Sequence, residues 1–283
     1  MLAAQLGASA GEGGRLDAEL LTACSPWFEG TVESLLLARI GFVAAGDATP
    51  GSRIVLMRDA GVVHRVAELM SDEIVPHVRR AQAGFAAYAE RQGLLRSGRA
   101  GLVDVGYGAT MQSAIQKTLG ISLVGFYMAV TASARKVGEE GGHAFGAFAE
   151  GDAAACFGGE FGLFLEAVLS APHGQVVGYT VPKRRRQPSA PLFDADGASQ
   201  HAFPVLEAIH AGILSHCLDR LATHGLQPEA DPFAMLRRLG EGTIAVPPEI
   251  GRALSVEDAF CGNGEIDVLA RSARAPLEAG RTP

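Results

Sequence analysis

The stretch of residues 100–130, AGLVDVGYGATMQSAIQKTLGISLVGFYMAV, constrains the fold more than any other part of the chain. It contains a short apolar strand, a glycine-rich turn, a helix, a helix-ending glycine and a second apolar strand, at residues 102–105, 106–109, 111–119, 120 and 121–130. Thr110 comes directly before the expected helix, at the N-cap position, and its hydroxyl can accept a hydrogen bond from a backbone N–H of the first turn. A helical crossover of this length joins parallel strands. The stretch therefore predicts a βαβ unit.

From this unit we predict an α/β protein with a Rossmann-like parallel sheet and extensive added helices. The 283 residues are 48% apolar and 19% charged, which is typical of a globular protein with a large core. We expect a single α/β domain over residues 1–283. Its parts are a mainly helical N-terminal part, the βαβ core and a helical C-terminal part, at 1–99, 100–182 and 183–283.

Local patterns predict further elements along the chain. Apolar residues at helical spacing predict helices at 31–43, 76–92, 157–170 and 201–224, and shorter patterns predict helices at 231–239 and 255–260. We also expect a strand at 175–181, a loose leader at 1–15 and a loop at 133–151.

Charge and cysteine content limit the function classes. A net charge of −7 argues against a nucleic-acid partner, because neutralising phosphates needs a basic face. The four cysteines are scattered without metal-type spacing, which favours a reducing, cytoplasmic location. No apolar run is long enough to span a bilayer, and the N-terminus lacks the pattern of a signal peptide.

The glycine turn is the place where chemistry is expected. Backbone N–H groups at a helix N-terminus attract phosphate, and an acid at a strand end can hold Mg²⁺ or a ribose hydroxyl. Asp104 is thus a candidate metal ligand, with Gly106, Gly108 and Thr110 as candidate phosphate-binding residues. The alternative is a tight turn that needs glycine for backbone reasons alone. The spacing matches neither a dinucleotide fingerprint nor a Walker loop.

Residues 102–112, LVDVGYGATMQ, resemble the VDVGW-x-GT-x-Q segment of a group of predicted haloacid-dehalogenase-like (HAD-like) hydrolases. Those proteins are found in bacterial surface-polysaccharide gene clusters, sometimes fused to glycosyltransferases. Weaker likeness extends over residues 70–265, including the Ala171-Pro-His-Gly174 and Gly178-Tyr179 segments. Tyr107 replaces the usual Trp, and Ala109 takes the place of a Gly.

The resemblance implies a HAD-like parallel sheet and a Mg²⁺-dependent phosphohydrolase acting on a phosphorylated small molecule or sugar, with a glycosyltransferase as a further partner. It places Asp104 in the late acidic region that holds Mg²⁺, as a candidate catalytic residue. Around it, the resemblance implies ligand and phosphate contacts at Gly106, Tyr107, Gly108, Thr110 and Gln112. The N-terminal D-x-D nucleophile of such proteins is missing, since Asp194-Ala-Asp196 lies in an expected loop. The chain therefore looks like the carboxyl-terminal part of such a protein, or a member without its nucleophile.

Two other functions stay open. Asp104 followed by Gly108-Ala-Thr110 also resembles a phosphoribosyltransferase loop, in which Thr110 would hold the 5-phosphate and Asp104 the ribose. A non-catalytic interaction domain is the third class. Glu166 and His173 are secondary site candidates; their ordinary roles would be a helix-surface carboxylate and a turn residue. The basic run at 183–186 could meet an anionic substrate but is usually a solvated surface.

Overall fold

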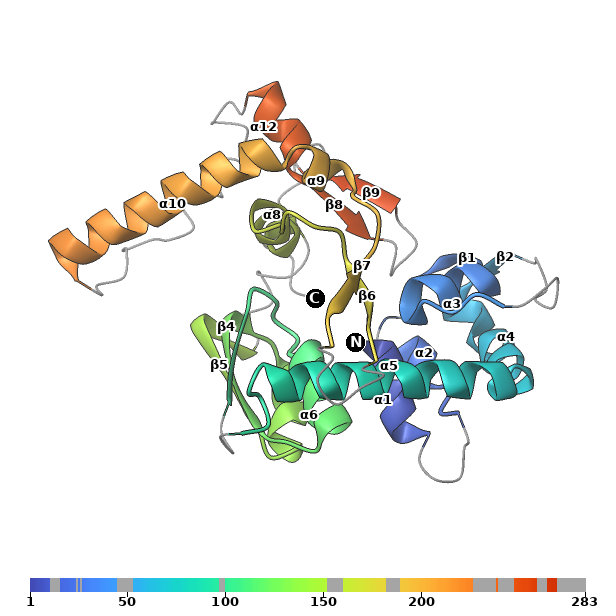
Figure 1. Cartoon of the computed structure of the whole chain (residues 1–283). Helices are drawn as coiled ribbons and strands as arrows, with labels where there is room; N and C mark the ends of the chain where they lie inside the picture. Colours follow the sequence, from blue (N-terminus) through green and yellow to red (C-terminus); the bar gives the residue numbers. More distant parts are fainter. Residues whose placement is uncertain are drawn as a thin grey trace, which may run out of the picture. The chain divides into compact units, whose positions relative to one another are not determined.

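The computed structural model of the chain (Figure 1) describes residues 1–10, 16–23, 25, 27–44, 53–96, 100–151, 160–181, 189–225, 238, 247–258 and 264–268. It divides into two compact units. The first comprises Met1–Ala155, Gln175–Asp194 and Asp258–Gly264, and the second comprises Cys156–Gly174, Ala195–Glu257 and Glu265–Pro283. Whether the chain folds as the single domain expected from sequence stays a prediction, because compactness alone does not show independent folding.

The first unit contains the parallel sheet. Its order is β3-β4-β5, and both neighbouring pairs are parallel. The strands and their crossovers are β3 (Ala100–Asp104), α6 (Thr110–Leu119), β4 (Leu123–Val130), the 3-10 helix η1 (Ala132–Ala134), α7 (Arg135–Glu139) and β5 (His143–Glu150). The predicted α/β class and the parallel pair are thereby confirmed. The loop predicted at 133–151 is wrong, because this segment forms η1, α7 and the third strand.

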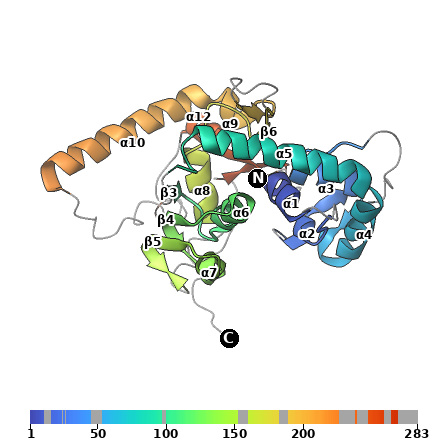
Figure 2. The same cartoon turned by 60° about the horizontal axis from the view of Figure 1, so that its bottom comes forward.

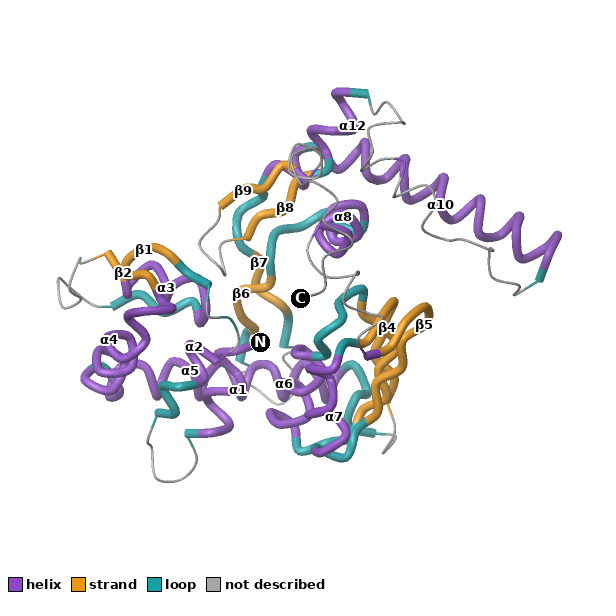
Figure 3. Tube along the Cα trace, turned by 180° about the vertical axis from the view of Figure 1, so that it is seen from behind, coloured by secondary structure: helices purple, strands orange, loops and turns teal. Residues whose placement is uncertain are grey.

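Both crossover helices, α6 and α7, lie on one face of this sheet (Figure 3). Right-handed crossovers between strands added in one direction place consecutive helices on the same face. On that face Leu123 and Tyr127 are buried. On the other face Val103 and Phe126 remain 84% and 51% exposed. The burial pattern is therefore one-sided, whereas fully parallel sheets are ordinarily covered on both faces.

The N-terminal helices of the first unit build the largest apolar core of the described residues. They are α1 (Leu2–Ser9), α2 (Leu20–Ala23), α3 (Val32–Ile40), α4 (Leu56–Leu69) and α5 (Ser71–Arg91), with the antiparallel pair β1 (Glu29–Thr31) and β2 (Arg53–Val55). The loose leader predicted at 1–15 is wrong for α1, because Leu2 and Leu6 are buried and the helix packs on α5 and α6 (Figure 2). Residues 11–15 lie outside the described residues.

A hairpin of β6 (Val176–Tyr179) and β7 (Pro191–Phe193) packs against α5 and confirms the strand predicted at 175–181. Ser189 fixes it there, because its hydroxyl donates to the carbonyl oxygens of Gly84 (2.9 Å) and Thr180 (2.8 Å). The hairpin also approaches α5 closely: a Cβ on Gly84 would lie 2.8 Å from the carbonyl oxygen of Tyr179. The basic run at 183–186 lies outside the described residues.

The second unit has a small core around Ala167, Leu206 and Ala253. Its elements are α8 (Glu160–Val168), α9 (Ala198–His201), α10 (Phe203–His224), α12 (Pro248–Ala253) and the paired strands β8 (Ser255–Asp258) and β9 (Gly264–Asp267). The helical turn predicted at 255–260 is wrong where the chain is described, because β8 pairs with β9. The helix predicted at 231–239 lies outside the described residues except for Arg238. Within the described part of the chain, no helix combines the length and apolar character needed to cross a bilayer.

Candidate functional site

The turn after β3 begins with Asp104, whose Oδ1 accepts a hydrogen bond from the Gly106 N–H at 2.9 Å. Residues 104–108 are half-buried, so the turn is neither sealed in the core nor fully exposed. It ends at Ala109, which has φ 50° and is the one described non-glycine residue with a positive φ. This left-handed conformation is unfavourable for a residue with a Cβ and is typical of positions held by their surroundings. Ala109 is buried in a small apolar cluster that includes Tyr127 and Val137.

Helix α6 begins directly after this strained residue. Its N-cap is Ala109, with no side-chain cap, so the prediction that Thr110 caps the helix is wrong. Thr110 is instead the first helical residue. In the described structure, the backbone N–H groups of residues 107–112 donate no hydrogen bond within the protein. Unpaired amides at the start of a helix, reinforced by the helix dipole, attract anions.

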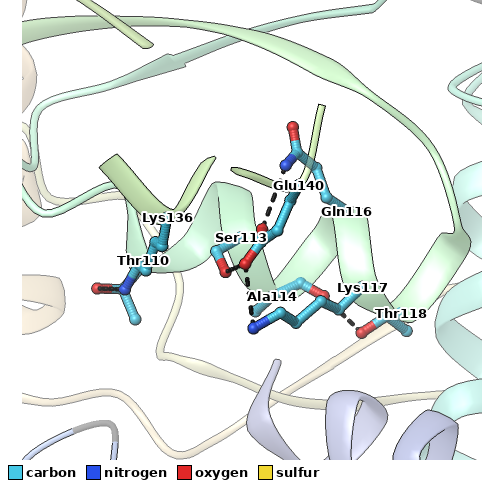
Figure 4. A network of polar contacts seen from close by, with 8 residues as sticks. All are labelled: Thr110, Ser113, Ala114, Gln116, Lys117, Thr118, Lys136 and Glu140. Carbon is cyan, nitrogen blue, oxygen red and sulfur yellow. Dashed lines mark hydrogen bonds and ion pairs between the residues drawn. The ribbon is translucent and has the colours of Figure 1, made fainter. Parts of the chain in front are cut away.

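Lys136 brings a cation to the same place from α7. Its Nζ donates to Oγ1 of Thr110 at 3.4 Å (Figure 4). Burial lowers the pKa of Lys136; Glu140 partly opposes this shift, and Lys117 adds to it. The ammonium group is therefore partly desolvated, and a bound anion would restore the stabilisation that water no longer supplies.

The loop after β4 forms the neighbouring side of this site. The backbone N–H and the hydroxyl of Thr131 both donate to the carbonyl oxygen of Tyr107, at 2.9 and 3.1 Å. The hydroxyls of Thr131 and Ser133 lie 2.7 Å apart. A Cβ on Gly108 would lie 3.3 Å from the Thr110 hydroxyl and 3.4 Å from that of Ser133. Two loops at the carboxyl ends of adjacent parallel strands thus meet, which is where open α/β folds bind ligands.

Gln112 has a different role from the one expected. Its side chain is fully buried, and its Nε2 donates to the carbonyl oxygens of Leu123 (3.0 Å) and His143 (2.9 Å). Its Oε1 accepts the Tyr127 hydroxyl at 2.9 Å. Burial, together with the charge of Asp104, raises the pKa of Tyr127, so the hydroxyl remains a donor. Gln112 therefore joins α6 to β4 and to the start of β5, and only its backbone N–H faces the turn.

Glu140 links α6 to α7 and so fixes the position of Lys136 (Figure 4). Its carboxylate accepts the Ser113 hydroxyl at 2.8 Å and the Gln116 amide at 3.3 Å, and it lies 3.0 Å from Nζ of Lys117. Lys117 is half exposed, whereas Glu140 is largely buried. This network holds α6 and the end of α7 together.

The secondary candidates lie in the second unit. Glu166 is exposed on α8, and Nδ1 of His173 donates to the carbonyl oxygen of Gly174 at 3.0 Å. Asp104 belongs to the first unit. Glu166 thus lies on a helix surface, and His173 lies in a turn.

Sequence reasoning missed Lys136, Thr131 and Ser133. They follow a buried strand directly, in the segment Thr-Ala-Ser-Ala-Arg-Lys at 131–136. Because the carboxyl ends of parallel strands meet at one sheet edge, hydroxyl and basic residues after the second strand were the available signal. Treating 133–151 as a loop concealed it.

Asp104 is the carboxylate at this site that could contact a metal ion. The described residues contain no group of three or more His, Cys, Asp or Glu side chains placed to hold one. Mg²⁺ is commonly held by one or two carboxylates, with substrate phosphates and water completing its shell. The donor set therefore fits a Mg²⁺ ion that arrives with a phosphate better than a resident ion.

Comparison of the chain with models of protein families, with curated proteins and with solved structures finds no match.

Proposed function

We propose that the first unit binds the phosphate group of a small molecule or sugar, as a HAD-like phosphohydrolase or a degenerate relative of one in surface-polysaccharide metabolism. One observation carries the proposal: Lys136, the Thr110 hydroxyl and the unpaired amides of residues 107–112 lie at one edge of a parallel sheet.

Each group has a separate part in holding the phosphate. The amides and the Thr110 hydroxyl would donate hydrogen bonds to its oxygens, and Lys136 would neutralise charge at short range. Asp104 has the wrong charge to contact phosphate directly. It would instead accept a hydroxyl of the sugar or bind a Mg²⁺ ion that the phosphate also contacts. Mg²⁺, when bound, would withdraw charge from the phosphoryl oxygens.

These groups account for the binding of phosphate, whereas its hydrolysis needs further groups and is decided by an activity assay. Asp104 is the only carboxylate in residues 100–112, and one of its oxygens is held by Gly106. A covalent mechanism needs a nucleophile and a separate acid/base group. Neither role is assigned to a residue of this chain.

Calorimetry with inorganic phosphate and with glucose 1-phosphate, each with and without Mg²⁺, tests the binding claim. Hydrolysis of p-nitrophenyl phosphate with Mg²⁺ that is lost in Asp104→Ala supports the hydrolase, and binding without hydrolysis supports the degenerate relative. Pyrophosphate release from phosphoribosyl pyrophosphate that is also lost in Asp104→Ala would instead indicate a phosphoribosyltransferase. If no phosphorylated compound binds, the proposal fails and the interaction domain remains.

A further inference from the structure

The first unit contains a cavity of about 930 Å³, and none of the residues that line it belongs to the Asp104 turn. It is bounded by the carboxyl-terminal half of α3, by α5 around Arg80 and by the β6–β7 hairpin. Its volume lies in the range of about 300–1,000 Å³ that is usual for small-molecule sites. The cavity therefore has the size of a ligand pocket rather than of a packing defect.

The walls of this cavity are largely apolar. Four large side chains that line it stay about half exposed: Leu37, Val177, Val181 and Leu192. They come from α3 and from both sides of the hairpin, so they surround a common space. Covering such side chains with a hydrocarbon removes apolar area from water, which is favourable in proportion to the area buried.

An exposed cation also lines the cavity. Arg80 lines it, and its guanidinium has no ion-pair or hydrogen-bond partner in the described structure. Of the other charged groups at the cavity, Glu29 is paired with Arg53 at 2.7 Å, and Asp194 has an interaction of its own. His77, one helical turn before Arg80, donates from Nε2 to the carbonyl oxygen of Ile40 at 2.7 Å. Among the described residues that line the cavity, Arg80 is thus the charged group available to an anionic ligand.

Both walls are attached to α5, so the cavity is formed before any ligand arrives. The His77 hydrogen bond ties the end of α3 to α5. Ser189 and the close approach of Gly84 to Tyr179 tie the hairpin to the same helix. A preformed pocket binds without the entropic cost of ordering its walls.

We propose that this cavity binds a long-chain carboxylate, with its hydrocarbon body against Leu37, Val177 and Leu192 and its head group on Arg80. The guanidinium would take the carboxylate through paired N–H donors, as such groups do when a planar anion is available. The apolar walls select the chain, and the guanidinium of Arg80 selects the anionic head. This site is independent of the phosphate site at the Asp104 turn.

The test is a fluorescence titration of the full chain with 11-(dansylamino)undecanoic acid. We expect saturable binding with a blue shift, displacement by dodecanoate, and displacement by dodecanol that is about tenfold weaker because the alcohol lacks the charge. Arg80→Gln should weaken probe binding by a similar factor. The matched control is Arg58→Gln, since Arg58 is an exposed arginine on α4 that does not line the cavity.

A second variant tests the apolar wall without touching the charge. Leu37 is 52% exposed, so Leu37→Gln should fold normally and still weaken binding of the probe. No saturable binding, or binding that survives both Arg80→Gln and Leu37→Gln, would overturn the site. Equal displacement by dodecanol and dodecanoate would overturn the role of Arg80. Inorganic phosphate should displace no probe, which separates this result from the outcome at the Asp104 turn.

Discussion

The ammonium nitrogen of Lys136 lies 3.4 Å from the hydroxyl oxygen of Thr110, although the two residues are 26 positions apart in the sequence. The contact joins the start of α6 to α7, and both helices follow strands of one parallel sheet. It places a partly desolvated cation beside unpaired backbone amides. This pairing of charge with helix-terminal donors is the basis of the proposed phosphate site.

Replacing Lys136 should weaken phosphate binding without unfolding the protein. Lys136→Gln removes one charged contact to the ligand, which corresponds to a loss of affinity of about tenfold. Calorimetry with inorganic phosphate measures the change. Lys117→Gln is the matched control, because Lys117 lies on the neighbouring helix α6 and pairs with Glu140 rather than with Thr110. An equal loss in both variants would argue for a general effect of charge.

Anion affinity should depend on pH through Lys136. Burial lowers the pKa of this lysine, and a bound anion favours its charged form. The affinity for the anion is therefore highest at a pH below the lowered pKa and falls as the pH rises through it. The fall begins below the usual lysine pKa of about 10.4. Sulfate is the suitable probe, since it does not titrate in this range. In Lys136→Gln the affinity should be weak and independent of pH; the same fall in that variant would assign it to another group.

Gln112 should matter for stability rather than for ligand contact. Gln112→Ala leaves the Leu123 and His143 carbonyls and the Tyr127 hydroxyl without their partner. The Leu123 carbonyl and the Tyr127 hydroxyl are buried, and at about 1–3 kcal/mol for each we expect a loss of at least about 2 kcal/mol, measured by urea unfolding. Tyr127→Phe leaves only Oε1 of Gln112 unpaired and should cost about 1–2 kcal/mol. Equal losses would contradict the network.

The same network explains why residue 125 is glycine. A Cβ there would lie 2.1 Å from Oε1 of Gln112 and 2.4 Å from Cε2 of Tyr127. Gly125→Ala should therefore destabilise the protein by about 2 kcal/mol or more, because either side chain must move and lose its hydrogen bond. A Cβ on Gly138, in α7, would have open space around it, so Gly138→Ala should be neutral or stabilise by up to about 1 kcal/mol. Comparable thermal midpoints for the two variants would contradict the packing described.

The βαβ unit at residues 100–130 was predictable because its signals are local. Apolar strands, a glycine turn and a helix of the right length are all present within the segment, and β3, α6 and β4 confirm them. Strand β5 was not predictable in the same way. Its sequence, His-Ala-Phe-Gly-Ala-Phe-Ala-Glu, is rich in small residues, and pairing with β4 is what makes it a strand.

The candidate site was predictable only in part, since half of it depends on tertiary structure. Asp104, the glycines and Thr110 follow one another in sequence, and the structure keeps them together. The position of Lys136 depends on α7, and the burial of the Gln112 side chain depends in part on β5. The local sequence pattern revealed neither element. Ala109 has a φ of 50°, a conformation that glycine adopts readily and that the order of residues in the turn did not indicate.

The most direct test of the central claim is an NMR titration of ¹⁵N-labelled protein with inorganic phosphate. We expect the backbone amide resonances of residues 107–112 and the side-chain ammonium of Lys136 to shift together and to saturate with one affinity. Lys136→Gln should weaken that affinity, whereas Lys117→Gln should not. Resonances of these amides that stay unchanged at saturating phosphate, or shifts confined to residues outside the turn, would contradict it.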